Sequence, residues 1–71
     1  MKLTVNNEER TYETGTTVES VVRELTVPEG GEVPGGIAVA VNDEVVRRPA
    51  WAATPLGAGD RVDVLTAVQG G

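Results

Sequence analysis

Cysteine and histidine are both absent from this 71-residue chain. Without cysteine it has no disulfides and no thiol nucleophile, and without histidine it has no imidazole base. Zinc sites are built mainly from these two residue types, so carboxylates are the only side chains left for a metal ion. Redox and zinc chemistry are therefore excluded, and we expect neither a metal site nor a cofactor bound by this chain.

Aromatic residues and positive charge are scarce as well. Tyr12 and Trp51 are the only aromatic residues, too few for a platform on which nucleic-acid bases could stack. Eleven acidic residues against six basic ones give a formal charge of −5, which repels phosphate backbones and anionic lipid headgroups. The start of the chain has no apolar stretch of the kind found in signal peptides or membrane spans. We therefore expect no nucleic-acid partner, no membrane and a cytoplasmic location.

Alternating apolar and polar residues, separated by turn formers, predict several short strands. The expected strands cover residues 2–5, 10–13, 37–41, 44–47 and 61–68. The pairs Asn6-Asn7 and Asn42-Asp43 are the expected turns inside two hairpins. A single helix can do little but cover one face of a sheet, so the pattern indicates an α+β fold with four to five strands in a mixed sheet.

The helix is predicted to begin at Thr16-Thr17-Val18-Glu19. This is a capping-box pattern, in which the Thr16 hydroxyl accepts a backbone amide and Glu19 reaches back. Pro28 disfavours the helical conformation of the residue before it, so the helix should end near Thr26. One apolar stripe along this helix is expected in the core, made of Val18, Val21, Val22 and Leu25.

Three further features have simple interpretations. Residues 28–36 contain four glycines and two prolines and have no periodicity, which predicts a flexible loop. Trp51 lies in an irregular stretch and is expected to plug an edge of the core. Arg47-Arg48 is either a contact for acidic groups on a partner or a solvated pair. No repeat or linker divides the chain, so residues 1–71 are expected to form one domain.

The second half of the chain carries a likeness to a known family. The chain resembles the thiamine-biosynthesis sulfur-carrier proteins in residues 37–48 (IAVAVNDEVVRR), in Trp51 and Leu56, in residues 59–62 (GDRV) and in the ending 67–71 (AVQGG). The resemblance implies the ubiquitin-like β-grasp fold.

In that family the carboxylate of the terminal glycine is adenylated by an ATP-using enzyme similar to the ubiquitin-activating type. Sulfur then replaces a carboxylate oxygen, and the thiocarboxylate delivers sulfur to thiazole synthase. The resemblance thus implies a protein co-substrate with these two enzymes as partners and with no catalytic side chain. It assigns sulfur attachment to Gly71 and makes Gln69, Gly70 and Gly71 a flexible reactive tail. Glycines at the end suit a narrow cleft because they lack Cβ atoms.

A partner-binding face is a separate hypothesis. Ala38, Ala40, Leu65 and Ala67 are small or apolar and should share the sheet face turned away from the helix, where they would dock the partner enzymes. Chance use of alanine explains the same pattern equally well.

Other functions stay open at this point. The small subunit of molybdopterin synthase and a ubiquitin-like modifier of lysines resemble the carrier in fold and Gly-Gly ending, and a β-grasp interaction domain with an idle tail is a third alternative. Residues 41–46 (VNDEVV) and the ending 67–71 favour the thiamine carrier.

Overall fold

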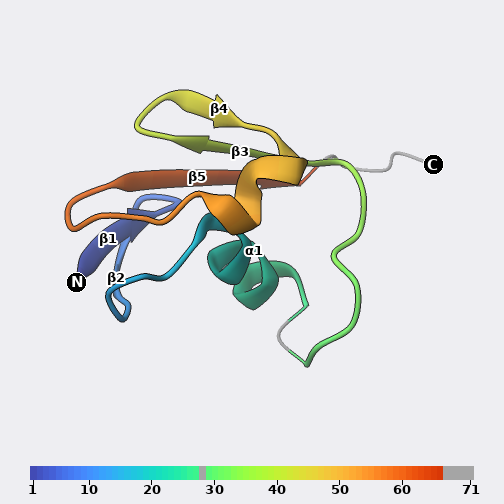
Figure 1. Cartoon of the computed structure of the whole chain (residues 1–71), viewed down its shortest axis with the longest axis horizontal. Coiled ribbons are helices and arrows are strands. Elements are labelled where there is room, and N and C mark those ends of the chain that lie inside the picture. The colour runs from blue at the N-terminus through green and yellow to red at the C-terminus, as the bar shows by residue number, and fades with distance from the viewer. Residues whose placement is uncertain (28, 67–71) are drawn as a thin grey trace.

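The computed structural model describes residues 1–27 and 29–66 (Figure 1). These residues form the strands β1 (Lys2–Val5), β2 (Glu8–Thr11), β3 (Ile37–Val41), β4 (Glu44–Val46) and β5 (Arg61–Thr66). Helix α1 spans Val18–Thr26, and a short 3-10 helix, η1, spans Arg48–Ala53. The α+β class with one main helix is confirmed.

The strands form one sheet in the order β2-β1-β5-β3-β4. β5 runs parallel to β1, with Thr4 opposite Arg61, and antiparallel to β3, with Val39 opposite Val64. The sheet is therefore mixed, as predicted. Its middle strand is β5, the last strand of the described chain.

Both hairpins turn on two residues in the left-handed backbone region. Asn6 and Asn7 have φ of 50° and 68°, and Asn42 and Asp43 have φ of 51° and 69°. Asparagine and aspartate tolerate this region better than other residues with a Cβ, and two such residues match the twist of the flanking strands. Because the first turn has only two residues, β2 already begins at Glu8. It spans Glu8–Thr11, two residues earlier in the chain than the strand predicted at 10–13.

The N-cap of α1 is Thr17, which corrects the prediction of Thr16. The Thr17 hydroxyl accepts the amide of Ser20 at 3.3 Å, whereas the Thr16 hydroxyl donates to the carbonyl of Glu13. Glu19 does not reach back, because its carboxylate pairs with Arg23 one turn later, at 3.0 Å. Adjacent threonines give the same sequence signal, and only the one next to the first helical residue can cap. The predicted end at Thr26 is confirmed.

The core lies between α1 and the sheet. Val18, Val21 and Val22 are fully buried, as predicted, but Leu25 is only half-buried at the rim of the core. Trp51 is 2% exposed and its indole N–H donates to the carbonyl of Val46 at 2.9 Å, which confirms its role as a plug. The stretch around it is helical, in η1, and not irregular.

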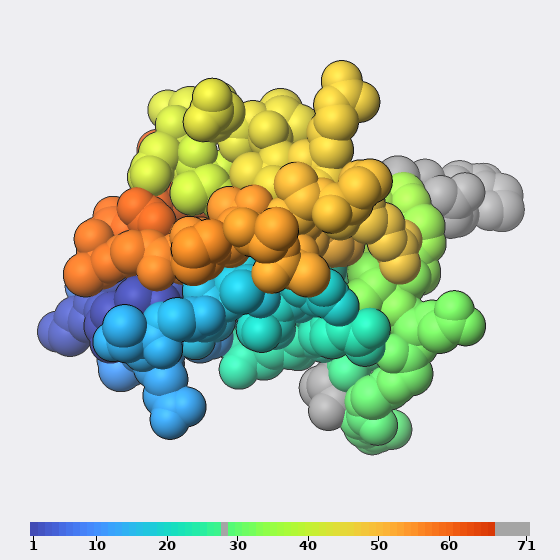
Figure 2. Space-filling model, viewed as in Figure 1, coloured from blue at the N-terminus to red at the C-terminus, as the bar shows by residue number. Residues whose placement is uncertain are grey.

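The glycine- and proline-rich loop contributes to the core, which the sequence did not indicate. Val33 is buried, and the Arg48 guanidinium donates to the carbonyls of Val33 and Pro34 at 2.6 and 3.0 Å. The same guanidinium lies 5.5 Å from the centre of the Trp51 ring, within cation–π range. Arg48 thus holds the loop against η1, which neither interpretation of the arginine pair foresaw. Figure 2 shows the loop at one side of the molecule.

Candidate functional site

The strand that leads to the predicted tail is held firmly in the sheet. Thr66, the last described residue, lies opposite Ile37, the first residue of β3 (Figure 1). The loop 29–36 ends at the same place, because it leads directly into β3. The residues assigned to the reactive tail, Gln69, Gly70 and Gly71, lie outside the described residues. The structure therefore defines the end of the sheet at which residues 67–71 begin, which we call the tail end.

Three of the four residues predicted to bind partners lie together on the outer face of the sheet, the face turned away from α1. Ala38 lies opposite Leu65, and Ala40 lies opposite Asp63. Side chains alternate along a strand, and the neighbours of these residues, such as Val39, face the core. Leu65 is 68% exposed. The fourth residue, Ala67, lies outside the described residues.

Val45 belongs to the same surface, although the sequence analysis missed it. It lies opposite Ala40 on β4 and is 73% exposed. Val45 and Leu65 are the exposed large hydrophobic residues of the described chain. The two-residue turn at Asn42-Asp43 fixes the register of this hairpin, so counting outward from the turn along both strands pairs Val45 with Ala40 and would have found it. The resulting surface, called here the outer patch, comprises Ala38, Ala40, Val45 and Leu65.

Charged side chains occupy the opposite end of the same face. Arg61 pairs with Asp43 and, at 3.3 Å, with Asp63. All three side chains are substantially exposed, so these pairs contribute little to stability. Two carboxylates around one guanidinium leave this corner with one net negative charge.

Asp60 stabilises the turn beneath that corner. Its carboxylate accepts the amide of Gly57 at 2.7 Å and the side-chain amide of Asn42 at 3.0 Å. The pKa of Asp60 lies below its ordinary value. The hydrogen bond from the Gly57 N–H contributes most and the one from the Asn42 side chain contributes next, because both favour the charged carboxylate. This acidic group is thus committed to the fold and is not a candidate for acid–base chemistry.

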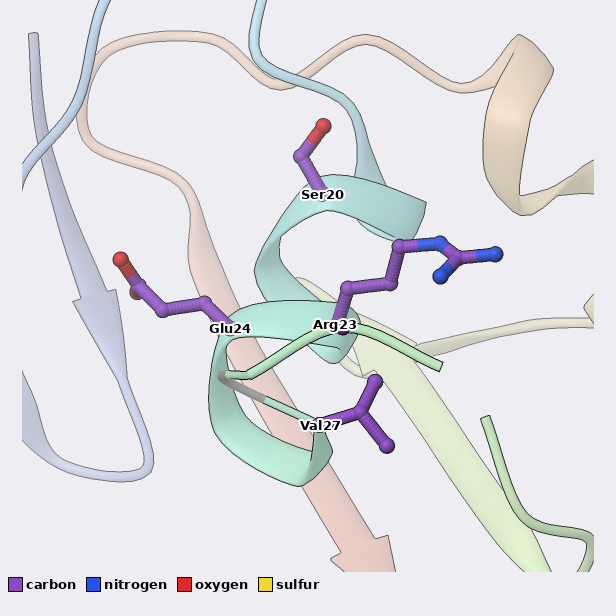
Figure 3. A pocket seen from close by; sticks show the side chains of 5 residues that line it. Ser20, Arg23, Glu24 and Val27 are labelled. Atoms are coloured by element: carbon purple, nitrogen blue, oxygen red, sulfur yellow. The ribbon is translucent and has the colours of Figure 1, made fainter. Parts of the chain in front are cut away.

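The hollows on the surface of the described chain do not gather reactive groups. One is lined by Ser20, Arg23, Glu24, Val27 and Gly30, and Figure 3 shows the first three side chains pointing in different directions. Arg23 donates from its guanidinium to Glu19 and to the carbonyl of Gly31. The groups that line this hollow therefore have partners within the chain or point away from it.

A second hollow lies beside β2 and involves Tyr12 and Glu24. The Tyr12 hydroxyl donates to the Glu24 carboxylate at 2.6 Å, and the Arg10 guanidinium lies 3.3 Å from that carboxylate. The pKa of Tyr12 is raised, mainly by burial of the hydroxyl and secondly by its hydrogen bond to Glu24. Within residues 1–27 and 29–66, no group of three or more Asp and Glu side chains is placed to hold a metal ion.

None of the helices that the structure describes has the length and apolar character needed to cross a lipid bilayer.

Comparison with known proteins identifies the chain. The model of the ThiS family matches residues 3–71. A crystal structure of the thiamine biosynthesis protein ThiS from Geobacter metallireducens is similar over the whole of both chains, with 32% identity and a TM-score of 0.75. The chain is also 32% identical, over all 71 residues, to a thiazole synthase of Paramagnetospirillum magneticum, but it spans only 20% of that protein's length.

The mixed sheet with one covering helix and the full-length likeness to a solved ThiS chain define a small protein with the β-grasp fold. More narrowly, the chain belongs to the ThiS family, whose members are small sulfur carriers of thiamine biosynthesis rather than enzymes. The predicted family and fold are both confirmed.

Proposed function

We propose that the chain carries sulfur as a thiocarboxylate on Gly71 and delivers it to a thiazole synthase. The observation that carries this proposal is that the match to the ThiS family extends to residue 71 and so includes the Gly70-Gly71 ending. The chain has no cysteine and no histidine, so a main-chain carboxylate is the group best suited to carry sulfur covalently.

The proposed chemistry has two steps on the activating enzyme. A carboxylate oxygen of Gly71 attacks the α-phosphorus of ATP, pyrophosphate leaves and an acyl adenylate forms. A donor that supplies sulfur at the oxidation level of hydrosulfide then attacks the carbonyl carbon. The bond from that carbon to the phosphate oxygen breaks, AMP leaves, and loss of the S–H proton gives the thiocarboxylate. ATP is bound by the activating enzyme and not by this chain. We assign the chain to the cytoplasm. Two glycines allow close approach of the backbone to an enclosed cleft.

The proposed recipient is a thiazole synthase. In Paramagnetospirillum magneticum, a protein of that name includes a region similar to the whole of this chain within a much longer polypeptide. A carrier domain joined covalently to an enzyme reaches it at a high effective concentration, which suits a pair that works in sequence. This observation supports a thiazole synthase as the second partner.

The outer patch is the proposed docking face for both partners. It is exposed, it lies beside the tail end of the sheet, and its larger members are apolar. The core of a protein interface is more apolar than its polar rim, and removing apolar surface from water favours association. The core is on the other face, so docking here leaves the fold unchanged.

The proposal is tested by intact mass after incubation with the cognate activating enzyme, ATP and a sulfur donor. We expect a gain equal to the exchange of one oxygen for sulfur. The chain lacking Gly70 and Gly71 should show no gain, and its melting temperature should stay unchanged, since glycine has no side chain to contribute to a core. A gain in the truncated chain would contradict the proposal.

A second variant separates the need for a carboxylate from the need for glycine. Gly71→Val keeps the terminal carboxylate but adds a β-branched side chain, so sulfur incorporation should fail or slow severely. A ladder of conjugates on other proteins would instead indicate a ubiquitin-like modifier. A lasting complex with the large subunit of molybdopterin synthase would indicate that the chain is the small subunit of that enzyme.

A further inference from the structure

Arg47 differs from the other basic residues of the described chain. Lys2, Arg10, Arg23 and Arg61 each form an ion pair, and Arg48 is bonded to two carbonyls. Arg47 is exposed and forms neither an ion pair nor a side-chain hydrogen bond within residues 1–27 and 29–66. An exposed guanidinium retains five N–H donors, which fit a carboxylate in a bidentate arrangement.

The backbone directs Arg47 to the outer face. Val46 lies opposite Val39 and packs against the core, and Arg47 follows it with extended dihedral angles, φ −74° and ψ 149°. Side chains alternate along extended backbone, so Arg47 lies on the same side as Val45. Continuing the antiparallel register by one residue places Arg47 beside Ala38.

The outer face therefore consists of rows that cross the strands. The row at the tail end contains Arg47, Ala38 and Leu65, and the next row contains Val45, Ala40 and Asp63. Beyond them lie Arg61 and Asp43, which form the acidic corner together with the carboxylate of Asp63 from the second row. The face thus has, at the tail end, a cation that is unpaired among the described residues, then an apolar centre, and a net negative charge at the far end.

Rotating the chain by half a turn on a flat apolar patch would point the tail away from the partner's cleft. A charge difference along the patch prevents this error, because like charges that meet at an interface oppose binding. The cation is expected to act at the rim of the cleft and not on the nucleotide, because Gly71 is five residues further along the chain than the end of the sheet, and five residues can reach at most about 16 Å.

We propose that Arg47 binds a carboxylate of the activating enzyme at the mouth of the cleft that receives the tail, and so orients the carrier. The proposal rests on the proposed function and adds to it the chemistry of the partner surface. The partner for this contact is the activating enzyme, because it must align the unmodified terminus before any covalent step.

The test measures kcat and KM for sulfur incorporation with the carrier as varied substrate and ATP in excess. Arg47→Gln should raise KM about fivefold and Arg47→Glu about tenfold or more, with kcat unchanged, as for a charge at an interface rim. Arg47→Lys should restore most of the affinity. The difference from wild type should shrink between about 0.05 and 0.5 M salt, where screening shortens the Debye length severalfold.

Arg23→Gln is the matched control, since it removes the same charge from α1, on the other side of the molecule. Its KM should change less than that of Arg47→Gln. An unchanged KM in Arg47→Glu, an equal rise in Arg23→Gln, or a loss confined to thiazole formation would overturn the docking proposal. If the wild-type chain gains no sulfur at all, the proposed function fails and the docking proposal fails with it.

Discussion

The two faces of the sheet are built from the same strands but have opposite roles. On the inner face, Val39, Val62 and Val64 are buried beneath α1 and η1, at no more than 7% exposure. On the outer face, the alternate residues of the same strands are exposed or half-buried and include Leu65 at 68% exposure. The inner face stabilises the fold, and the outer face contributes little to it. A small domain can therefore present an apolar surface to partners without weakening its core.

The largest expected effect is on the free energy of unfolding, and it distinguishes the two faces of the sheet. The same change, leucine to alanine, is made separately at Leu3, Leu25 and Leu65. Leu3→Ala should lower the free energy of unfolding by about 2 to 5 kcal/mol, because Leu3 is 1% exposed on the inner face. Leu25→Ala should cost about 1 to 2 kcal/mol, since Leu25 is half-buried. Leu65→Ala should change it by less than about 0.5 kcal/mol. Urea titrations measure all three.

Equal costs at Leu3 and Leu65 would mean that the outer face belongs to the core. A cost below about 0.5 kcal/mol at Leu25 would remove it from the apolar stripe altogether.

A smaller effect on free energy, but a clear one on binding, is expected when a charge enters the outer patch. Leu65→Glu should raise KM for the activating enzyme about tenfold, which is the loss expected when one apolar contact near the centre of an interface is replaced by a carboxylate. The melting temperature should hardly move. Thr11→Glu is the control, because Thr11 is exposed and lies opposite Lys2 on the same face, two strands from β5.

If both glutamate variants raise KM equally, added negative charge and not the outer patch is responsible. If neither does, the partner binds elsewhere.

The smallest expected effect concerns the acidic end of the outer face. The folded-state pKa of Asp60 is lowered, so its carboxylate stabilises the fold above the unfolded pKa, and this contribution is lost as pH falls through the folded pKa. Asp60→Asn should therefore cost about 1 kcal/mol near neutral pH, and less and less in acid. Urea titrations between neutral and strongly acidic pH measure it, with Glu44→Gln as an exposed control. A cost that does not depend on pH would contradict the assigned hydrogen bonds.

Local chemistry was enough to predict most of the elements. Asn6-Asn7 and Asn42-Asp43 predicted both hairpins because few other residues accept two successive positive φ angles. Pro28 predicted the end of α1, and alternation predicted which residues of β3 face outward.

Long-range contacts could not be predicted from local patterns. Val33 is buried in the core and its carbonyl accepts from Arg48, fifteen residues later, and nothing in a loop rich in glycine and proline indicates either contact. Arg47 and Arg48 look equivalent in sequence, yet Arg48 is bonded to the loop, whereas Arg47 is exposed and has no side-chain partner within residues 1–27 and 29–66. The tail was assigned by family resemblance, and its role stays a prediction.

The central position of β5 has a consequence for the order of events during synthesis. Both hairpins depend on this strand: it pairs with β1 and β3, and the side-chain carbonyls of Asn6 and Asn42 accept its amides at 2.7 and 3.0 Å. An isolated two-stranded hairpin is marginally stable at best. Because the ribosome makes β5 after both hairpins, the sheet closes only when the residues directly before the tail have emerged. Under the proposed function, the tail is then offered to an enzyme on a finished domain, so maturation of the fold precedes use of the terminus without a separate checkpoint.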